Sequence, residues 1–136
     1  MTNNLLNAQK LTMTAVVCGV LSSTHAHAAP LYSCVYENAS ENSRFEVRIR
    51  EESSDALFSY KFSPRGASTS VQGEMTVEKT DVTWSHFIFT GSDANGKVKL
   101  SVPAGLEDTS VYMNFDVTVN GQFFEPIEYL ECKRAR

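Results

Sequence analysis

Strict alternation of apolar and polar residues marks the last part of the chain. Across residues 111–119 the odd positions are apolar and the even positions are tyrosine or polar, so one face of a strand is apolar. Asn120 and Gly121 follow at once, and both tolerate the positive φ that a two-residue type I′ turn requires. Residues 123–132 are again rich in aromatic and aliphatic side chains. We therefore predict a hairpin whose return strand ends at Cys132.

Six earlier segments carry the same kind of signal, each bounded by turn residues. The strands that we expect there are residues 31–36, 44–50, 56–62, 68–79, 82–90 and 98–102. Gly73 inside the fourth segment suggests a bulge or a sharp bend, and Pro126 requires an edge position or a bulge in the return strand. About eight short strands with frequent turns predict an all-β antiparallel meander, closed or nearly closed as a small β-barrel. A two-sheet β-sandwich is the alternative.

The segment 82–90 differs from the other strands because both of its faces are apolar or aromatic. The side chains on one face would be Val82, Trp84, His86 and Ile88, and those on the other Phe87 and Phe89. Such a strand is either covered on both sides or presents aromatic surface to a partner. Exposure of Trp84 would distinguish these two cases.

Residues 1–28 have the pattern of a cleaved secretory signal peptide. Lys10 is the only charge among them, residues 11–21 are mostly apolar, and Ala26 and Ala28 are small residues at the positions that a signal peptidase reads. The apolar run is far shorter than the roughly 20 residues of a membrane span. Cys18 lies inside that run without the small preceding residue of a lipoprotein. We expect a single exported domain, residues 29–136, in the periplasm or the extracellular medium, with no membrane span.

Two cysteines, Cys34 and Cys132, remain in the mature part of the chain. Thiols in an oxidising compartment tend to pair, and two cysteines allow only one connectivity. A redox site would show a close Cys-x-x-Cys spacing, which is absent. We therefore predict a structural disulfide that joins the first and the last strand.

Charge and residue types argue against several functions. Without Lys10, residues 29–136 carry eleven basic and sixteen acidic side chains, a net charge of −5, whereas nucleic-acid partners require clustered positive charge. His86 is the only histidine outside the signal peptide, and no Gly-x-Ser-x-Gly motif is present. The Asp93–Gly96 segment lacks the acidic positions of a calcium loop and is interpreted as a hairpin turn. We expect no catalytic residue, no metal site and no cofactor, and a monomeric protein.

The chain layout resembles that of the periplasmic inhibitors of C-type lysozyme. The resemblance rests on Tyr32-Ser33-Cys34 at the start of a small all-β domain and on Cys132 close to its end. Those inhibitors insert a Ser-Gly-rich loop into the enzyme cleft, and the nearest segment here, residues 64–68, does not match it. The resemblance implies a similar fold, and a shared fold does not by itself fix function.

The function that we predict is that of an exported, non-enzymatic binding module. Its partner would be a protein, with inhibition of a hydrolase such as lysozyme as the sharpest version, or a small apolar ligand. The candidate binding residues are Trp84, His86, Arg65 and Tyr112. A structural envelope domain without a discrete ligand is the alternative. A hydrolase that uses carboxylates has the least support, and its candidate residues are Glu125, Glu128 and Glu131.

Overall fold

The computed structural model describes residues 29–135, which form an all-β domain with one short 3₁₀ turn. The predicted signal peptide, Cys18 included, lies outside these residues. The elements are β2 (Leu31–Asn38), η3 (Ala39–Glu41), β3 (Ser43–Arg50), β4 (Asp55–Phe62), β5 (Val71–Val82), β6 (His86–Ser92), β7 (Gly96–Pro103), β8 (Ser110–Val119), β9 (Gln122–Phe124) and β10 (Ile127–Arg134). Within residues 29–135 no helix has the length and apolar character needed to cross a bilayer.

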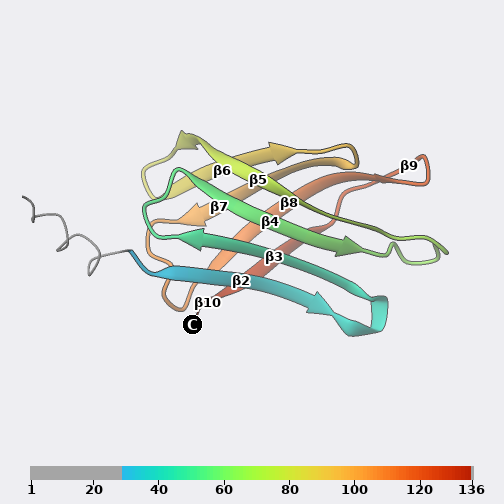
Figure 1. The fold of residues 1–136 in the computed structure, drawn as a ribbon, viewed down its shortest axis with the longest axis horizontal. Coiled ribbons are helices and arrows are strands. Elements are labelled where there is room, and N and C mark those ends of the chain that lie inside the picture. The colour runs from blue at the N-terminus through green and yellow to red at the C-terminus, as the bar shows by residue number, and fades with distance from the viewer. Residues whose placement is uncertain (1–28, 136) are drawn as a thin grey trace, which may run out of the picture.

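The strands form one antiparallel sheet that closes on itself. Each strand from β2 to β8 pairs with the next along the chain, and β10 pairs with both β8 and β2. The result is an eight-stranded barrel with β9 as an outer strand beside β8 (Figure 1). The predicted closed barrel is therefore confirmed, and the two-sheet alternative does not apply.

The barrel has two ends, which differ in the loops they carry. The proximal end, near the C-terminus, has the loops at residues 51–54, 83–85 and 104–109. The distal end has those at residues 39–42, 63–70, 93–95 and 120–121 (Figure 1). Both ends of the described chain are proximal, and the backbone N–H of Ala135 donates to the carbonyl of Leu31 at 2.8 Å.

The final hairpin has the predicted turn. Asn120 and Gly121 have φ of 53° and 80°, as a type I′ turn requires. Pro126 interrupts the return strand without changing its register. Before the proline Phe124 pairs with Val117 of β8, and after it Ile127 pairs with Asn114 of β8. Proline removes an N–H donor without shifting the strand, and its carbonyl still accepts from Phe115 at 3.0 Å.

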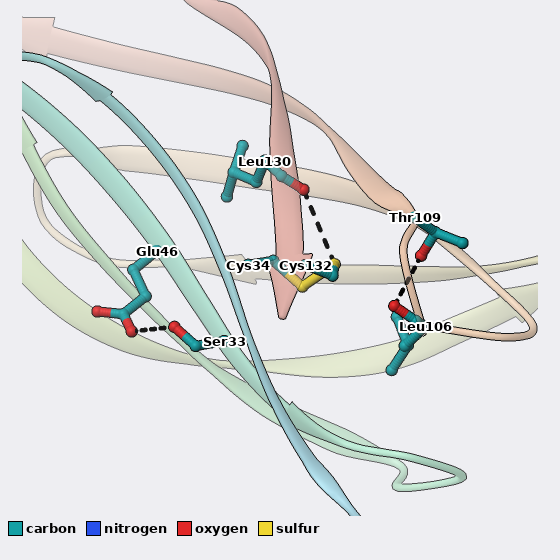
Figure 2. Close-up of a disulfide and its surroundings, with 7 residues drawn as sticks. All are labelled: Ser33, Cys34, Glu46, Leu106, Thr109, Leu130 and Cys132. Carbon is teal, nitrogen blue, oxygen red and sulfur yellow. Dashed lines mark hydrogen bonds between the residues drawn. A yellow bond between two sulfur atoms is a disulfide. The ribbon is translucent and has the colours of Figure 1, made fainter. Parts of the chain in front are cut away.

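The disulfide lies where the barrel closes. Cys34 and Cys132 are direct partners in the β2–β10 register, both side chains are buried, and their sulfur atoms are bonded (Figure 2). This pairing runs only from Glu131 to Arg134 on β10, whereas the β2–β3 pairing covers all eight residues of each strand. The covalent bond thus reinforces one of the two shortest pairings of the closed barrel, the other being β5–β6.

Aromatic side chains fill the barrel interior. The rings of Phe45, Phe58 and Phe115 are fully buried, with centroids 5.4 Å apart for Phe58 and Phe115 and 6.4 Å apart for Phe45 and Phe58. Tyr60 extends this cluster, its ring centroid 4.8 Å from that of Phe115. A Cβ atom on Gly73 would lie 2.7 Å from Tyr60 Oη, so this glycine leaves room for the tyrosine ring.

The predicted boundary between the fourth and fifth strands is wrong. The bulge lies at Thr80 and not at Gly73, because Lys79 pairs with Phe89 while Asp81 pairs with Ile88. The extra residue carries β5 on to Val82, and the chain turns through residues 83–85. Trp84 is consequently a turn residue and does not share a strand face with His86 and Ile88.

We predict that the disulfide contributes strongly to stability because it closes a loop of nearly the whole domain. The sequence separation of 98 residues corresponds to at most about 4.7 kcal/mol of unfolding free energy in the chain-entropy model. Urea unfolding of the C34A/C132A variant should give a free energy of unfolding lower by about 2–4.7 kcal/mol than that of the oxidised protein. Equal stability of the two proteins would contradict this role.

Candidate functional site

The turn between β5 and β6 presents the most exposed large hydrophobic side chain of the described residues. Trp84 is 97% exposed and the adjacent Val82 is 58% exposed. Thr83 fixes the turn: its backbone N–H donates to the carbonyl of His86 at 2.8 Å, and its hydroxyl accepts from the backbone N–H of His86 at 3.0 Å. The backbone that carries Trp84 is therefore held by hydrogen bonds while the indole ring extends into solvent.

His86 lies in the same turn region and is half-buried at the proximal rim. It begins β6 opposite Pro103 of β7, and its Nδ1 is 2.9 Å from the hydroxyl of Ser85. Among residues 29–135 no salt bridge involves His86. The structure thus brings Trp84 and His86 together in one short segment, as the sequence suggested, although by a turn and not by a strand face.

The proximal mouth beneath this turn is filled by side chains. Lys79 points inward, and its Nζ lies 4.2 Å from the ring centroid of Phe87 and 6.0 Å from that of Phe89. Beside these rings lies a cavity of about 10 Å³, which is about the volume that a single water requires. The mouth therefore offers no space for a small apolar ligand of ordinary size.

Arg65 lies at the opposite end of the barrel from Trp84. It belongs to the loop between β4 and β5, and its Nη2 is 2.6 Å from Oε2 of Glu41 in η3. The hydrogen bond and the charge of Glu41 raise the pKa of the Arg65 guanidinium. The whole length of β5, roughly 35–40 Å at about 3.3 Å per residue, separates this loop from the Trp84 turn (Figure 1). These two residues do not form one site.

Tyr112 lies on the outer wall of the barrel, on β8. Its cross-strand partner on β10 is Tyr129, and the two ring centroids are 5.1 Å apart. Tyr112 is 36% exposed and Tyr129 is 64% exposed. The predicted site residues include Tyr112 but not Tyr129, although both tyrosines belong to the aromatic side chains typical of interfaces. The four predicted residues therefore fall on three separate surfaces.

The three glutamates of the low-weight hydrolase hypothesis are spread over different surfaces. Glu128 pairs with the buried Met113 on the interior side, whereas Glu131 on the same strand is exposed to solvent. Partial burial raises the pKa of Glu128, with a smaller opposing effect of a hydrogen bond from Tyr36. Glu125 lies outside the barrel, at the break between β9 and β10. The spacing in sequence therefore does not produce a pair of facing carboxylates.

The turn at Asp93–Gly96 uses its acidic side chain internally. Asp93 Oδ1 accepts from the backbone N–H of Asn95 at 2.9 Å and of Gly96 at 3.1 Å, and Oδ2 accepts from the hydroxyl of Tyr60. Asn95 Nδ2 also donates to Tyr60 Oη at 2.8 Å. Within the described part of the chain no cluster of metal-ligating side chains occurs. The segment is a hairpin turn that seals the distal end around Tyr60.

Comparison of the chain with models of known protein families, with curated proteins and with solved structures finds no match.

We predict that the Tyr60 cluster makes stability fall at alkaline pH. Burial and the neighbouring Asp93 carboxylate raise the pKa of Tyr60 to about 12 from 10.0. Because the folded state holds this proton more tightly than the unfolded chain, its contribution is complete below pH 10 and is lost as the pH rises toward 12.

Urea unfolding of the wild type and of the Y60F variant measures this contribution between pH 9 and 12, a range that covers the ordinary and the raised pKa of Tyr60. The wild type should be more stable than Y60F at pH 9, where Tyr60 donates to Asp93, and the difference should shrink as Tyr60 ionises. Y112F, which changes an exposed tyrosine, is the matched control. A difference that stays constant over the whole pH range would contradict the assignment.

Proposed function

We propose that this chain is an exported, non-enzymatic binding module that contacts a partner protein through the Trp84 turn, residues 82–86. The specific activity that we propose to test first is inhibition of a hydrolase such as lysozyme. The observation that carries the proposal is the 97% exposure of Trp84 on a turn whose backbone is fixed by Thr83 and His86.

The energetic argument concerns the area of the indole ring. Burial of a tryptophan removes about 150–250 Å² from water, which corresponds to roughly 4–6 kcal/mol at about 25 cal/mol per Å² before the costs of association. The folded barrel gains none of this, since Trp84 packs against no interior residue. A partner with an apolar pocket would gain it, and tryptophan is among the residues most enriched at the energetic centres of protein interfaces.

Trp84 exposure favours binding over the structural alternative. If Trp84 were buried, the aromatic segment would simply be part of the core. Its exposure gives no stability to a structural domain without a ligand, so it favours a binding role. The filled proximal mouth, with its cavity of about 10 Å³, favours a protein over a small apolar ligand. The Cys34–Cys132 disulfide supports export, because such bonds persist in oxidising compartments.

The test uses the fact that Trp84 is the only tryptophan of the chain. Protein labelled with 5-fluorotryptophan gives one ¹⁹F resonance, so an unlabelled partner contributes no signal even if it contains tryptophan. Transfer from H₂O to D₂O should shift this resonance, since the indole is exposed. Addition of purified C-type lysozyme should then move or broaden it, and lysis of bacterial cell walls by the enzyme should slow.

Two variants separate the turn from general surface effects. W84A should weaken inhibition at least 30-fold, as expected for an interface centre worth about 2 kcal/mol or more. F123A changes another exposed aromatic residue, 61% exposed at the distal end, and should inhibit like wild type. The proposal would be overturned if the ¹⁹F resonance of Trp84 showed no solvent isotope shift. It would also be overturned for this enzyme class if neither the wild type nor F123A inhibited lysozyme.

A further inference from the structure

An open groove of about 450 Å³ crosses the outer wall of the barrel over β6, β7 and β8. This volume lies within the range of roughly 300–1,000 Å³ that small-ligand sites occupy. We name it the polar groove, and its main side chains are Ser92, Lys97, Lys99, Asn114, Asp116 and Glu125. It lies toward the distal end, away from the Trp84 turn.

Strand register explains why these side chains meet. Lys97 and Lys99 of β7 pair with Asp116 and Asn114 of β8, and all four alternate with the buried side chains of their strands. Glu125 reaches the groove because Pro126 interrupts the return strand at that point. The groove is therefore built on sheet residues held by main-chain pairing, which makes it a preformed surface.

The charges in the polar groove balance, unlike those of the chain as a whole. Two ammonium groups, of Lys97 and Lys99, face two carboxylates, of Asp116 and Glu125, while the full chain carries a net charge of −4. Within residues 29–135 no salt bridge involves any of these four side chains. A balanced groove gives no net attraction to an anion or a cation, but it offers both donors and acceptors to a neutral ligand.

Asp116 contributes a half-buried carboxylate to the wall of the groove. Its Oδ1 is buried and has no hydrogen-bond partner, and no other buried side-chain nitrogen or oxygen of the described residues lacks one. Solvent does not reach this oxygen, so a ligand in the groove would meet the accessible part of the half-buried Asp116 side chain. A hydroxyl group can donate to Asp116 and at the same time accept from a lysine or from Asn114.

The tyrosine pair extends this surface along the same strands. Tyr112 lies two residues from Asn114 on β8, about 7 Å away on the same face, and its ring lies beside the tilted ring of Tyr129 on β10. Ile127, the cross-strand partner of Asn114, is also exposed and connects the tyrosines to the groove. The combined surface offers hydrogen-bonding groups next to exposed aromatic rings.

We propose that the polar groove and the Tyr112–Tyr129 pair form a binding site for a neutral oligosaccharide. One sugar lies in the groove and donates a hydroxyl hydrogen bond to the Asp116 carboxylate, while its other hydroxyls accept from Lys97, Lys99 and Asn114. The next sugar packs the apolar C–H face of its ring against Tyr112. Neutral sugars combine these features, because each ring carries hydroxyls around its edge and apolar faces above and below. This site is independent of the Trp84 turn.

The experiment is a ¹H–¹⁵N NMR titration of the oxidised protein with cellotetraose, maltotetraose and chitotetraose, each at millimolar concentration. At least one of these neutral tetrasaccharides should shift the amide resonances of residues 90–99 and 112–116 while leaving those of residues 82–86 unchanged. Tetragalacturonate serves as the anionic comparison. Absence of shifts with all three neutral probes, or tighter binding of tetragalacturonate, would overturn the proposal.

Variants test the roles of single residues. D116N should reduce affinity at least tenfold, because the amide replaces one carboxylate oxygen by a donor nitrogen and leaves the other a weaker acceptor. Y112A should reduce affinity by a similar factor. D81N, at an exposed aspartate outside the groove, is the matched control and should bind like wild type. K99Q provides a second groove variant should D116N fold poorly, and it should also weaken binding. Unchanged affinity in D116N, K99Q and Y112A together would contradict the site.

Discussion

Closure of the sheet between β2 and β10 is the constraint on which the rest of this structure depends. A closed barrel leaves its eight strands without free edges, and it forces every second side chain into a shared interior. The β2–β10 contact is short, and the Cys34–Cys132 bond lies inside it. Without this contact the first and last strands would be edges, and the core residues between them would face water.

Dense packing of the interior moves recognition to the outside. Small barrels either fill their interior with side chains or enclose one small ligand, and the packed rings of Phe45, Phe58 and Phe115 place this chain in the first group. Surfaces available for binding are then the loops at the ends and the outer wall. Trp84 exemplifies the first kind, and the polar groove the second. Both are held by main-chain hydrogen bonds, so neither requires the barrel to open.

The sequence predicted those parts of the fold that depend on local chemistry. Asn120 and Gly121 identify their turn by backbone freedom alone, and two cysteines outside residues 1–28 allow only the pairing of Cys34 with Cys132. Strand alternation gave the all-β class and most strand positions. The bulge at Thr80 was missed, because an extra residue in a pairing depends on the partner strand and leaves no pattern in its own segment. Gly73 drew the bulge prediction instead, although its role is to leave space for Tyr60.

The candidate site was only partly predictable for a similar reason. A tryptophan in an apolar segment gives the same sequence pattern whether it is exposed or buried. Only the position of the turn, residues 83–85, shows that Trp84 is exposed. Asp116 and Glu125 reach one groove through cross-strand register and the break at Pro126, which no spacing along the chain reveals. The pairing of Tyr129 with Tyr112 was missed because the two residues lie on different strands. Residues that cooperate across strands therefore need the register to be known.

The extra residue at Thr80 also decides which side chains enter the barrel mouth. A shift of one position exchanges the two faces of a strand. With Thr80 in place, Val82 is the partner of Phe87, and Asp81 stands opposite Ile88 on the solvent side. In an unbulged strand Asp81 would take the place opposite Phe87, and its carboxylate would point into the apolar mouth beside the aromatic rings. The bulge at Thr80 thus keeps the negative charge of Asp81 out of the apolar mouth.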